Sequence, residues 1–143
     1  MKALILVADG FEDLHLFCPW FRLREEGLEV TLASPSGKPV TGLRGHVAAC
    51  HMPIGEANPA DYDLLVVPGA VYIPWLKEME PVVAAFLKHH LDDGRAESVQ
   101  IITGHGRGST SGARLRPALL IILQNTGRFF SFDSLAVFTV YRR

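Results

Sequence analysis

The chain has 143 residues, of which 48% are hydrophobic and 20% charged, enough for one domain around one buried core. Its formal net charge of -1 gives no reason to expect nucleic acid or an anionic membrane as a partner. The apolar run over 118–123 is far shorter than the roughly 20 residues needed to cross a bilayer. These bulk properties indicate an ordinary globular protein.

The apolar start of the chain runs directly into Asp9-Gly10 without a small-residue cleavage site, so it predicts a first strand and not a signal peptide. The only cysteines are Cys18 and Cys50. Two cysteines without an export signal do not make a disulfide framework. We therefore expect the protein in the reducing cytoplasm.

Strands and helices are expected to alternate along most of the chain. Short apolar runs predict strands over 2–8, 28–33, 64–67 and 99–103, with shorter extended pieces near Val40 and over 46–50. Helical spacing predicts a helix over 13–26 ended by Gly27, and a second helix over 81–91 with Pro81 in its first turn. This order predicts an α/β three-layer sandwich with a mostly parallel sheet.

Ligands of such sheets bind at the carboxyl ends of the strands. The loops over 9–13, 68–73 and 104–108 are therefore the places where we look for chemistry.

The composition changes near residue 97. Residues 1–97 hold fourteen of the fifteen acidic residues and every lysine, whereas residues 98–143 hold one aspartate and six arginines. We treat 1–143 as a single domain with an atypical C-terminal part over 98–143. A basic surface, an altered reading of the gene that leaves the fold incomplete, and chance all remain open. A buried helix over 118–123 and a terminal strand over 135–141 are expected.

Three motifs occur in order and at a suitable separation. Residues 4–13 read LILVADGFED, residues 22–34 read RLREEGLEVTLAS, and residues 61–69 read DYDLLVVPG. Together they resemble the ThiJ/PfpI family of intracellular proteases and deglycases, in the class I glutamine amidotransferase-like superfamily, over about residues 2–94. The resemblance implies a flavodoxin-like fold, a cytoplasmic homo-oligomer, and hydrolysis that depends on a cysteine and needs no cofactor or metal.

The resemblance also implies where the catalytic groups should stand. The family places its cysteine, followed by histidine and glycine, on a strand-to-helix elbow. The best counterpart is IITGHG at 101–106, where His105 fits and Gly104 occupies the cysteine position. The family glutamate, four residues after the phenylalanine of the first motif, falls at His15, close to Glu12 of the first loop. Two central catalytic groups are therefore replaced.

The oxyanion position of the family lies near the turn that ends the second motif. Here the turn contains Gly69, and Ala70 stands where another glycine is usual. Backbone N–H groups at such a turn meet negative charge that develops on a reacting carbonyl. The sequence therefore predicts a family fold that binds a small molecule or peptide but turns it over weakly or not at all. The alternative is a non-catalytic module for small-ligand binding or dimerisation.

Other candidate residues have simpler interpretations. Cys18 lies three residues after His15 and forms a conceivable substitute pair, although a cysteine on an apolar helix face is usually core. His46, Cys50 and His51 offer zinc-ligand types without a matching second motif.

The remaining candidates are also weak. His89-His90 suit a helix C-terminus. The glycine-rich run over 104–110 lacks the lysine of a P-loop. Trp20, Tyr72 and Trp75 fit either a pocket lining or, more simply, burial or an oligomer contact.

Overall fold

The structure is a computed structural model that describes residues 1–69, 76–93, 95–96, 98–102, 130–134 and 137–141. Four parallel strands form the central sheet in the order β5-β2-β1-β6. Their bounds are Lys2–Leu6 for β1, Glu29–Ser34 for β2, Met52–Pro53 for β5 and Leu64–Val66 for β6. Two 3-10 turns, Ile54–Glu56 and Pro59–Asp61, connect β5 to β6.

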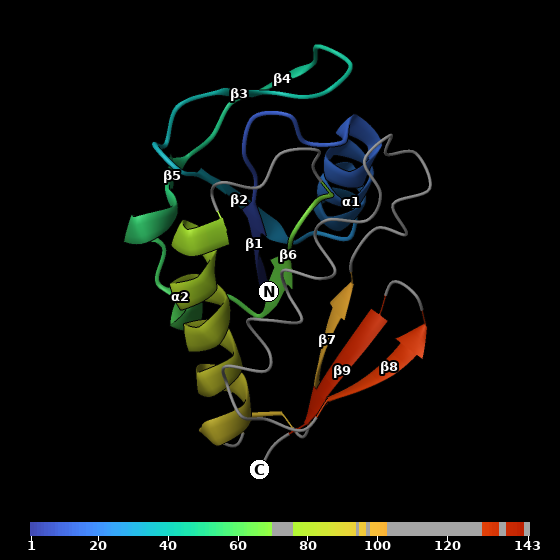
Figure 1. Cartoon of the computed structure of the whole chain (residues 1–143), viewed down its shortest axis with the longest axis vertical. Coiled ribbons are helices and arrows are strands. Elements are labelled where there is room, and N and C mark those ends of the chain that lie inside the picture. The colour runs from blue at the N-terminus through green and yellow to red at the C-terminus, as the bar shows by residue number, and fades with distance from the viewer. Residues whose placement is uncertain (70–75, 94, 97, 103–129, 135–136, 142–143) are drawn as a thin grey trace.

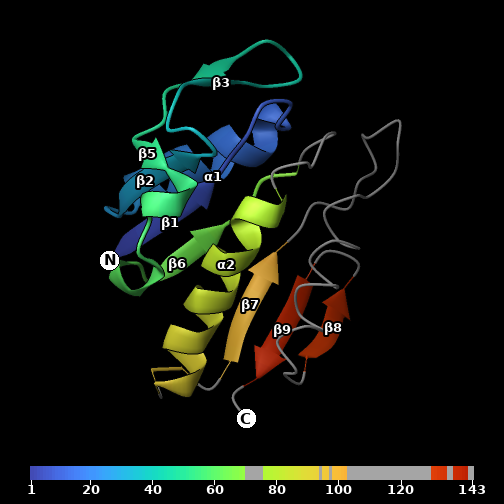
Figure 2. The ribbon, with the colours of Figure 1, turned by 60° about the vertical axis from the view of Figure 1, so that its left-hand side comes forward.

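Helices cover both faces of this sheet (Figures 1 and 2). Leu4 and Leu6 of β1 pack in the core cluster that contains α2 (Leu76–Leu87), whereas Ile5 packs in the cluster that contains Leu16 of α1 (Asp13–Glu25). Successive strand residues point to opposite faces, so β1 is buried on both sides. The three-layer α/β sandwich with a mostly parallel sheet is therefore confirmed.

The second helix differs from its prediction. It begins at Leu76, so Pro81 lies inside it and not in its first turn, and it continues as a π-helical turn over Lys88–Asp92. The predicted start was wrong because proline favours the first turn of a helix, whereas Pro81 lies at the sixth residue of α2, where it costs a backbone hydrogen bond. No helix among the described residues is long and apolar enough to span a membrane.

The C-terminal strands form a separate antiparallel sheet in the order β7-β9-β8. Their bounds are Ser98–Ile102 for β7, Phe130–Ser134 for β8 and Val137–Tyr141 for β9. The expectation that the strand near 99–103 joins the parallel sheet was therefore wrong, because β9 runs back alongside it. The terminal strand over 135–141 is confirmed in β9, and Val140 packs in the core cluster of α2. The helix expected over 118–123 lies outside the described residues.

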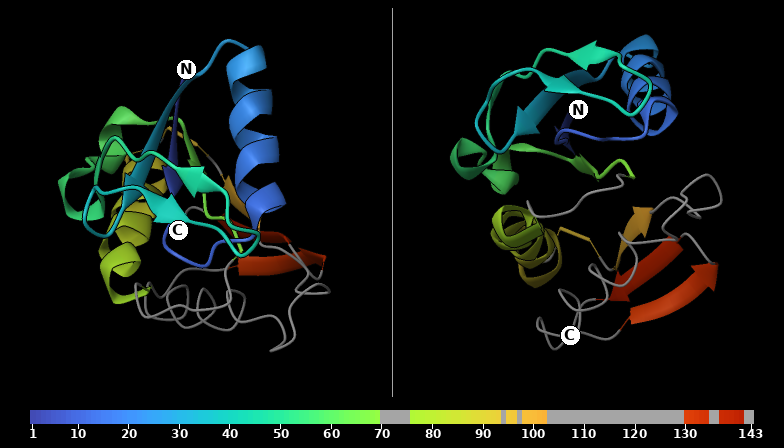
Figure 3. Two further views of the ribbon diagram at one scale, coloured as in Figure 1. Left: turned by 90° about the horizontal axis from the view of Figure 1, so that it is seen from above. Right: turned by 45° about the horizontal axis from the view of Figure 1, so that its top comes forward.

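A hairpin between β2 and β5 lies against the start of α1. Its strands are β3 (Val40–Thr41) and β4 (Val47–Ala48), which pair antiparallel. The peptide N–H of Gly10 donates to the Thr41 carbonyl at 2.8 Å, and that of Leu43 donates to the Phe11 carbonyl at 2.9 Å. Both views in Figure 3 place the hairpin beside the end of α1 where the helix begins.

The carboxylate of Asp13, in the first turn of α1, is the centre of this contact. Asp13 is only 2% exposed. Its Oδ2 accepts from the Arg44 peptide N–H at 2.9 Å, and its Oδ1 lies 2.6 Å from His46 Nδ1. A Cβ atom added at Gly42 would lie 2.6 Å from Asp13 Oδ2, so the close approach of hairpin and carboxylate requires a glycine there.

The hydrogen bonds to Asp13 outweigh the effect of its burial. Desolvation alone would raise the pKa of Asp13, but backbone hydrogen bonds from Arg44 and His46, the His46 ring and its charge together lower it below its ordinary value of 3.8. A carboxyl with a lower pKa in the folded than in the unfolded chain stabilises the fold above the unfolded value. That stabilisation is lost as the pH falls through the folded-state pKa.

We predict that Asp13→Asn lowers the free energy of unfolding at pH 7 by about 2 kcal/mol, the scale of hydrogen bonds to a charged group. The amide has only one acceptor oxygen for the backbone donors of Arg44 and His46 and the His46 ring. The deficit should shrink as the pH falls below the ordinary carboxyl pKa of 3.8 and through the lowered pKa of folded Asp13, because the wild-type carboxyl is then increasingly protonated. Urea unfolding from acid to neutral pH measures both effects.

Asp9→Asn is the matched control for this experiment. Asp9 Oδ1 accepts from the Thr41 peptide N–H at 2.8 Å in an exposed position, and an amide oxygen can keep that bond. Its stability should stay within about 0.5 kcal/mol of wild type at every pH. A pH-independent deficit in Asp13→Asn would contradict the role assigned to the Asp13 charge.

Candidate functional site

The carboxyl ends of β1 and β6 bring the first loop and the turn after β6 together. The peptide N–H of Glu12 donates to the Gly69 carbonyl at 2.7 Å. The side chain of Glu12 caps α1, because its Oε2 accepts from the His15 peptide N–H at 3.0 Å. Capping therefore fixes the Glu12 carboxylate at the carboxyl ends of the strands.

The His15 ring lies directly over Gly69. A Cβ atom added at Gly69 would come within 2.7 Å of His15 Nδ1, so a side chain at this position would have to displace the ring. His15 Nε2 lies 3.9 Å from Glu12 Oε2, at the distance of an ion pair and beyond hydrogen-bond range. The structure thus joins Glu12, His15 and Gly69, three of the residues predicted for the site.

Arg44 of the hairpin reaches the same group. Its Nε lies 3.6 Å from Glu12 Oε1, and its side chain is largely exposed. The Glu12 carboxylate therefore stands between an imidazole and a guanidinium. A carboxylate and an imidazole at an open strand end can bind a polar ligand and hold or pass a proton.

No thiol of the described residues joins this group. Cys18 is an exposed free cysteine on α1, and the structure records no hydrogen bond from it to His15. Cys50 is a free, half-buried cysteine before β5. Burial raises the pKa of the Cys50 thiol and the charge of Asp9 adds to this, while a hydrogen bond with Ser34 opposes it. A raised thiol pKa disfavours the thiolate, which is the nucleophilic form.

Three predicted site residues, Gly104, His105 and Ala70, lie outside the described residues, and so do Tyr72 and Trp75. Their predicted roles remain predictions.

The proposed zinc ligands do not converge. His46 binds Asp13, whereas His51 Nδ1 accepts from the Leu32 peptide N–H at 2.8 Å. No group of three or more histidine, cysteine or acidic residues in the described part of the chain could hold a metal.

The histidines at the end of α2 and Trp20 have ordinary packing partners. His89 Nδ1 lies 3.0 Å from Asp93 Oδ2, and His90 Nε2 lies 2.8 Å from the Tyr62 carbonyl. Trp20 stacks on Phe17 and Phe21 of its own helix. These contacts account for His90 and Trp20 without a ligand, whereas the buried Nε2 of His89 has no hydrogen-bond partner among the described residues.

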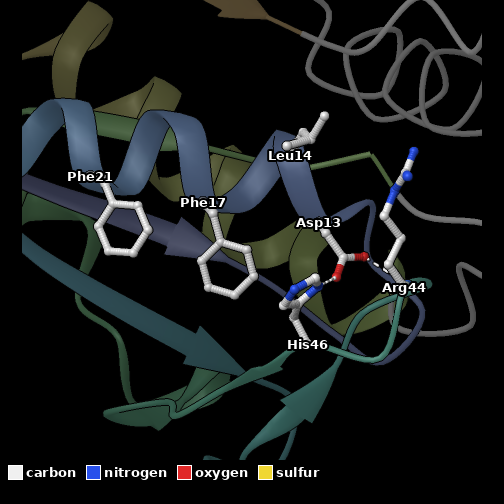
Figure 4. A pocket seen from close by; sticks show the side chains of 6 residues that line it. All are labelled: Asp13, Leu14, Phe17, Phe21, Arg44 and His46. Atoms are coloured by element: carbon white, nitrogen blue, oxygen red, sulfur yellow. Dashed lines mark hydrogen bonds and ion pairs between the residues drawn. The ribbon is translucent and has the colours of Figure 1, made fainter.

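A shallow pocket of about 420 Å³ lies between α1 and the hairpin (Figure 4). It is lined by Asp13, Leu14, Phe17, Phe21, Arg44 and His46. Sequence reasoning missed this pocket, because Asp13 and His46 are 33 residues apart and no local pattern joins them. The available signals were the helical spacing of the aromatic residues and the glycine-rich turn over 42–45.

The chain is similar to curated proteins that are named deglycases. It is 39% identical over 95 residues to the deglycase TK1284 of Thermococcus kodakarensis, covering 66% of this chain and 57% of that protein. It is 44% identical over 69 residues to the deglycase PfpI of Pyrococcus furiosus, covering 48% of this chain and 42% of that protein. The chain thus spans about half the length of these relatives.

Solved structures agree with this similarity. Oxidised DJ-1 of Toxoplasma gondii matches with a TM-score of 0.55 at 26% identity over 71% of this chain and 54% of that one. The DJ-1 superfamily protein Atu0886 of Agrobacterium tumefaciens matches in fold, with a TM-score of 0.56 at 24% identity over 72% of this chain and 52% of that one. The model of the DJ-1/PfpI family matches residues 1–101. This range includes Glu12, His15 and Gly69, which meet beyond the ends of β1 and β6. The chain therefore belongs to the DJ-1/PfpI family.

Proposed function

We propose that this chain keeps the ligand-binding side of a deglycase- or peptidase-type hydrolase pocket but lacks the thiol that performs the chemistry. The observation that carries the proposal is the group of Glu12, His15 and Gly69. In this group the imidazole of His15 stands at the position where the family resemblance leads us to expect a glutamate. At the expected cysteine position the sequence has Gly104. The deglycase names of the relatives support the reaction class.

The remaining groups suit a small carbonyl compound or a peptide that binds without forming a covalent bond. His15, close to the Glu12 carboxylate, offers a ring nitrogen that donates or accepts a hydrogen bond at the strand ends. Peptide N–H groups at the turn of Gly69 and Ala70 would face the carbonyl oxygen. Such contacts hold a ligand, but without a thiolate there is no nucleophile to attack it. We propose this binding role for a cytoplasmic protein that needs no cofactor.

We predict that both replaced groups must be restored before thiol-dependent turnover appears. The starting chain carries Cys18→Ser and Cys50→Ser, so that any thiol chemistry comes from the introduced residue. Gly104→Cys with His15→Glu should then remove a carbonyl adduct from an acetylated amino acid. The rate should exceed that of either single variant by roughly two orders of magnitude, the scale of a positioned acid or base. Adduct loss followed by chromatography measures the rate.

Gly104→Ser with His15→Glu is the matched control, because it adds a side chain of similar size without a thiol. Adduct removal by this control at the rate of the Gly104→Cys, His15→Glu chain, or no turnover by the latter chain, would show that Gly104 does not mark the missing nucleophile.

A second candidate function is a dimerisation module, and an apolar surface favours it. Among the described residues, four of the five large hydrophobic side chains that are exposed lie on α1 or on the hairpin. They are Leu14 (58% exposed), Phe21 (52%), Leu43 (50%) and Val47 (63%). The hairpin packs on the start of α1, and Figure 4 shows Leu14 and Phe21 on the helix that borders it. We call these four residues the α1-hairpin surface.

The α1-hairpin surface suits a second copy of the chain. Exposed apolar side chains on neighbouring elements favour burial against a partner, and a two-fold interface uses the same surface on both copies. Arg44 and Glu12 lie at its edge with opposite charges, so charge pairs between copies can form around an apolar centre. The proposed occupant is therefore a homodimer partner.

We predict that Phe21→Glu weakens self-association at least about tenfold, because a charge replaces a large apolar side chain in the buried centre. Ser36→Glu, an exposed turn position outside the α1-hairpin surface, should leave self-association unchanged. Light scattering across a concentration series measures the molar mass of each protein. A monomeric wild type at high concentration, or equal weakening by both variants, would exclude this interface.

A further inference from the structure

The segment over residues 35–51 leaves the sheet after β2, forms the hairpin and returns at β5. Two imidazoles hold it at its two sides. His46 binds the buried Asp13 carboxylate at the start of α1, with Nδ1 2.6 Å from Oδ1. His51 binds the edge of β2 at Leu32. These two attachments are named the His46 contact and the His51 contact.

In the His51 contact a side chain takes the place of a strand. The His51 peptide N–H donates to the Leu32 carbonyl at 2.8 Å, as in a sheet ladder. In return the Leu32 peptide N–H donates to His51 Nδ1, also at 2.8 Å, so a ring nitrogen stands where a neighbouring strand would offer a carbonyl. Leu32 is fully buried, and loss of this acceptor would leave a buried N–H group without a partner.

The two contacts need opposite states of the Nδ1 atom: it must be unprotonated in His51 and protonated in His46. His51 Nδ1 must keep a free lone pair, which only the neutral ring protonated at Nε2 provides. His46 Nδ1 faces a carboxylate that can only accept, so it must carry a proton, as both the Nδ1–H neutral ring and the imidazolium do. Protonation therefore removes the His51 contact and preserves the His46 contact.

The charged groups around each ring agree with this difference. His46 faces Asp13 and lies near Arg44, which in turn pairs with Glu12, and it meets the edge of Phe17. His51 has no ion pair among the described residues, which leaves no carboxylate to stabilise it by a new bond once it is protonated. The titratable residue next to His51 in the chain is Cys50, whose half-buried thiol is affected by the negative charge of Asp9.

We propose that this segment is a pH-sensitive element: protonation of His51 breaks the bond from the Leu32 peptide N–H to the His51 ring, while the attachment at α1 through His46 and Asp13 stays in place. Histidine is the side chain that most often acts as a pH switch in proteins, so acidification is the perturbation that tests this contact. The buried Leu32 peptide N–H then loses its acceptor, whereas the Leu32 carbonyl keeps its bond from the His51 peptide N–H. The element does not depend on the hydrolase pocket and stands apart from the proposed function.

The test follows two backbone amides of the full chain by hydrogen exchange in NMR. Between about pH 7.5 and about pH 5.5, the protection of the Leu32 amide, corrected for its intrinsic exchange rate, should fall by roughly tenfold. The Arg44 amide, which donates to Asp13, should keep its protection. A parallel change at both amides, or none at Leu32, would overturn the proposal.

The His51→Asn variant isolates the imidazole. The Asn amide oxygen can accept from Leu32 but does not change charge, so Leu32 protection should become independent of pH over the same range. Persistent pH dependence in this variant would overturn the proposal. Because the variant can also disturb the fold, the ring nitrogen shifts of wild-type His51 give an independent measurement. They should report the Nε2–H form at neutral pH, and an Nδ1–H form would contradict the His51 contact.

Discussion

The arrangement of this site depends on one buried carboxylate. Asp13 lies in the first turn of α1, where a negative charge suits the helix dipole but burial disfavours it. The donors that satisfy it come from Arg44 and His46, more than thirty residues further along the chain. The need to bond this carboxylate therefore places the hairpin. The hairpin in turn brings the Arg44 side chain to Glu12, which caps the same helix and borders Gly69.

Local patterns predicted the parts of the fold that local forces determine. The apolar run of β1 predicted a strand buried on both faces, and the helical spacing after Asp13 with Gly27 behind it predicted α1 to within a residue. The convergence of Glu12, His15 and Gly69 was predictable because parallel strands end at the same edge of a sheet.

Other features depend on contacts that the local sequence does not encode. The run in β7 indicates a strand but not whether its neighbour lies parallel or antiparallel, and only β9 decides this. The His46 and His51 contacts likewise join residues far apart in sequence, so histidines that resembled metal ligands proved to be hydrogen-bonding partners. Spacing identified the residue types but not their partners.

The replacement at His15 is compatible with the rest of the site because of Gly69. The ring occupies the space that any side chain at residue 69 would need, so the imidazole and the glycine form one steric unit. A glutamate at position 15 would carry its charge beside Glu12, and two carboxylates this close raise the pKa of one of them. When the imidazole of His15 is protonated, its positive charge instead attracts the Glu12 carboxylate. The described geometry thus pairs the residue at position 15 with Glu12.

The hairpin connects the three properties proposed for this protein. It carries Arg44, which reaches the ligand pocket, and Leu43 and Val47, which belong to the α1-hairpin surface. It also lies within the segment bounded by the His46 and His51 contacts. Because the His46 contact lies beside both Arg44 and the start of α1, loss of the ring bond between His51 and Leu32 leaves the groups at the pocket in place. A dimer partner on the α1-hairpin surface would press the hairpin onto α1 from outside. Self-association and the Asp13 contact would therefore both hold the hairpin on α1.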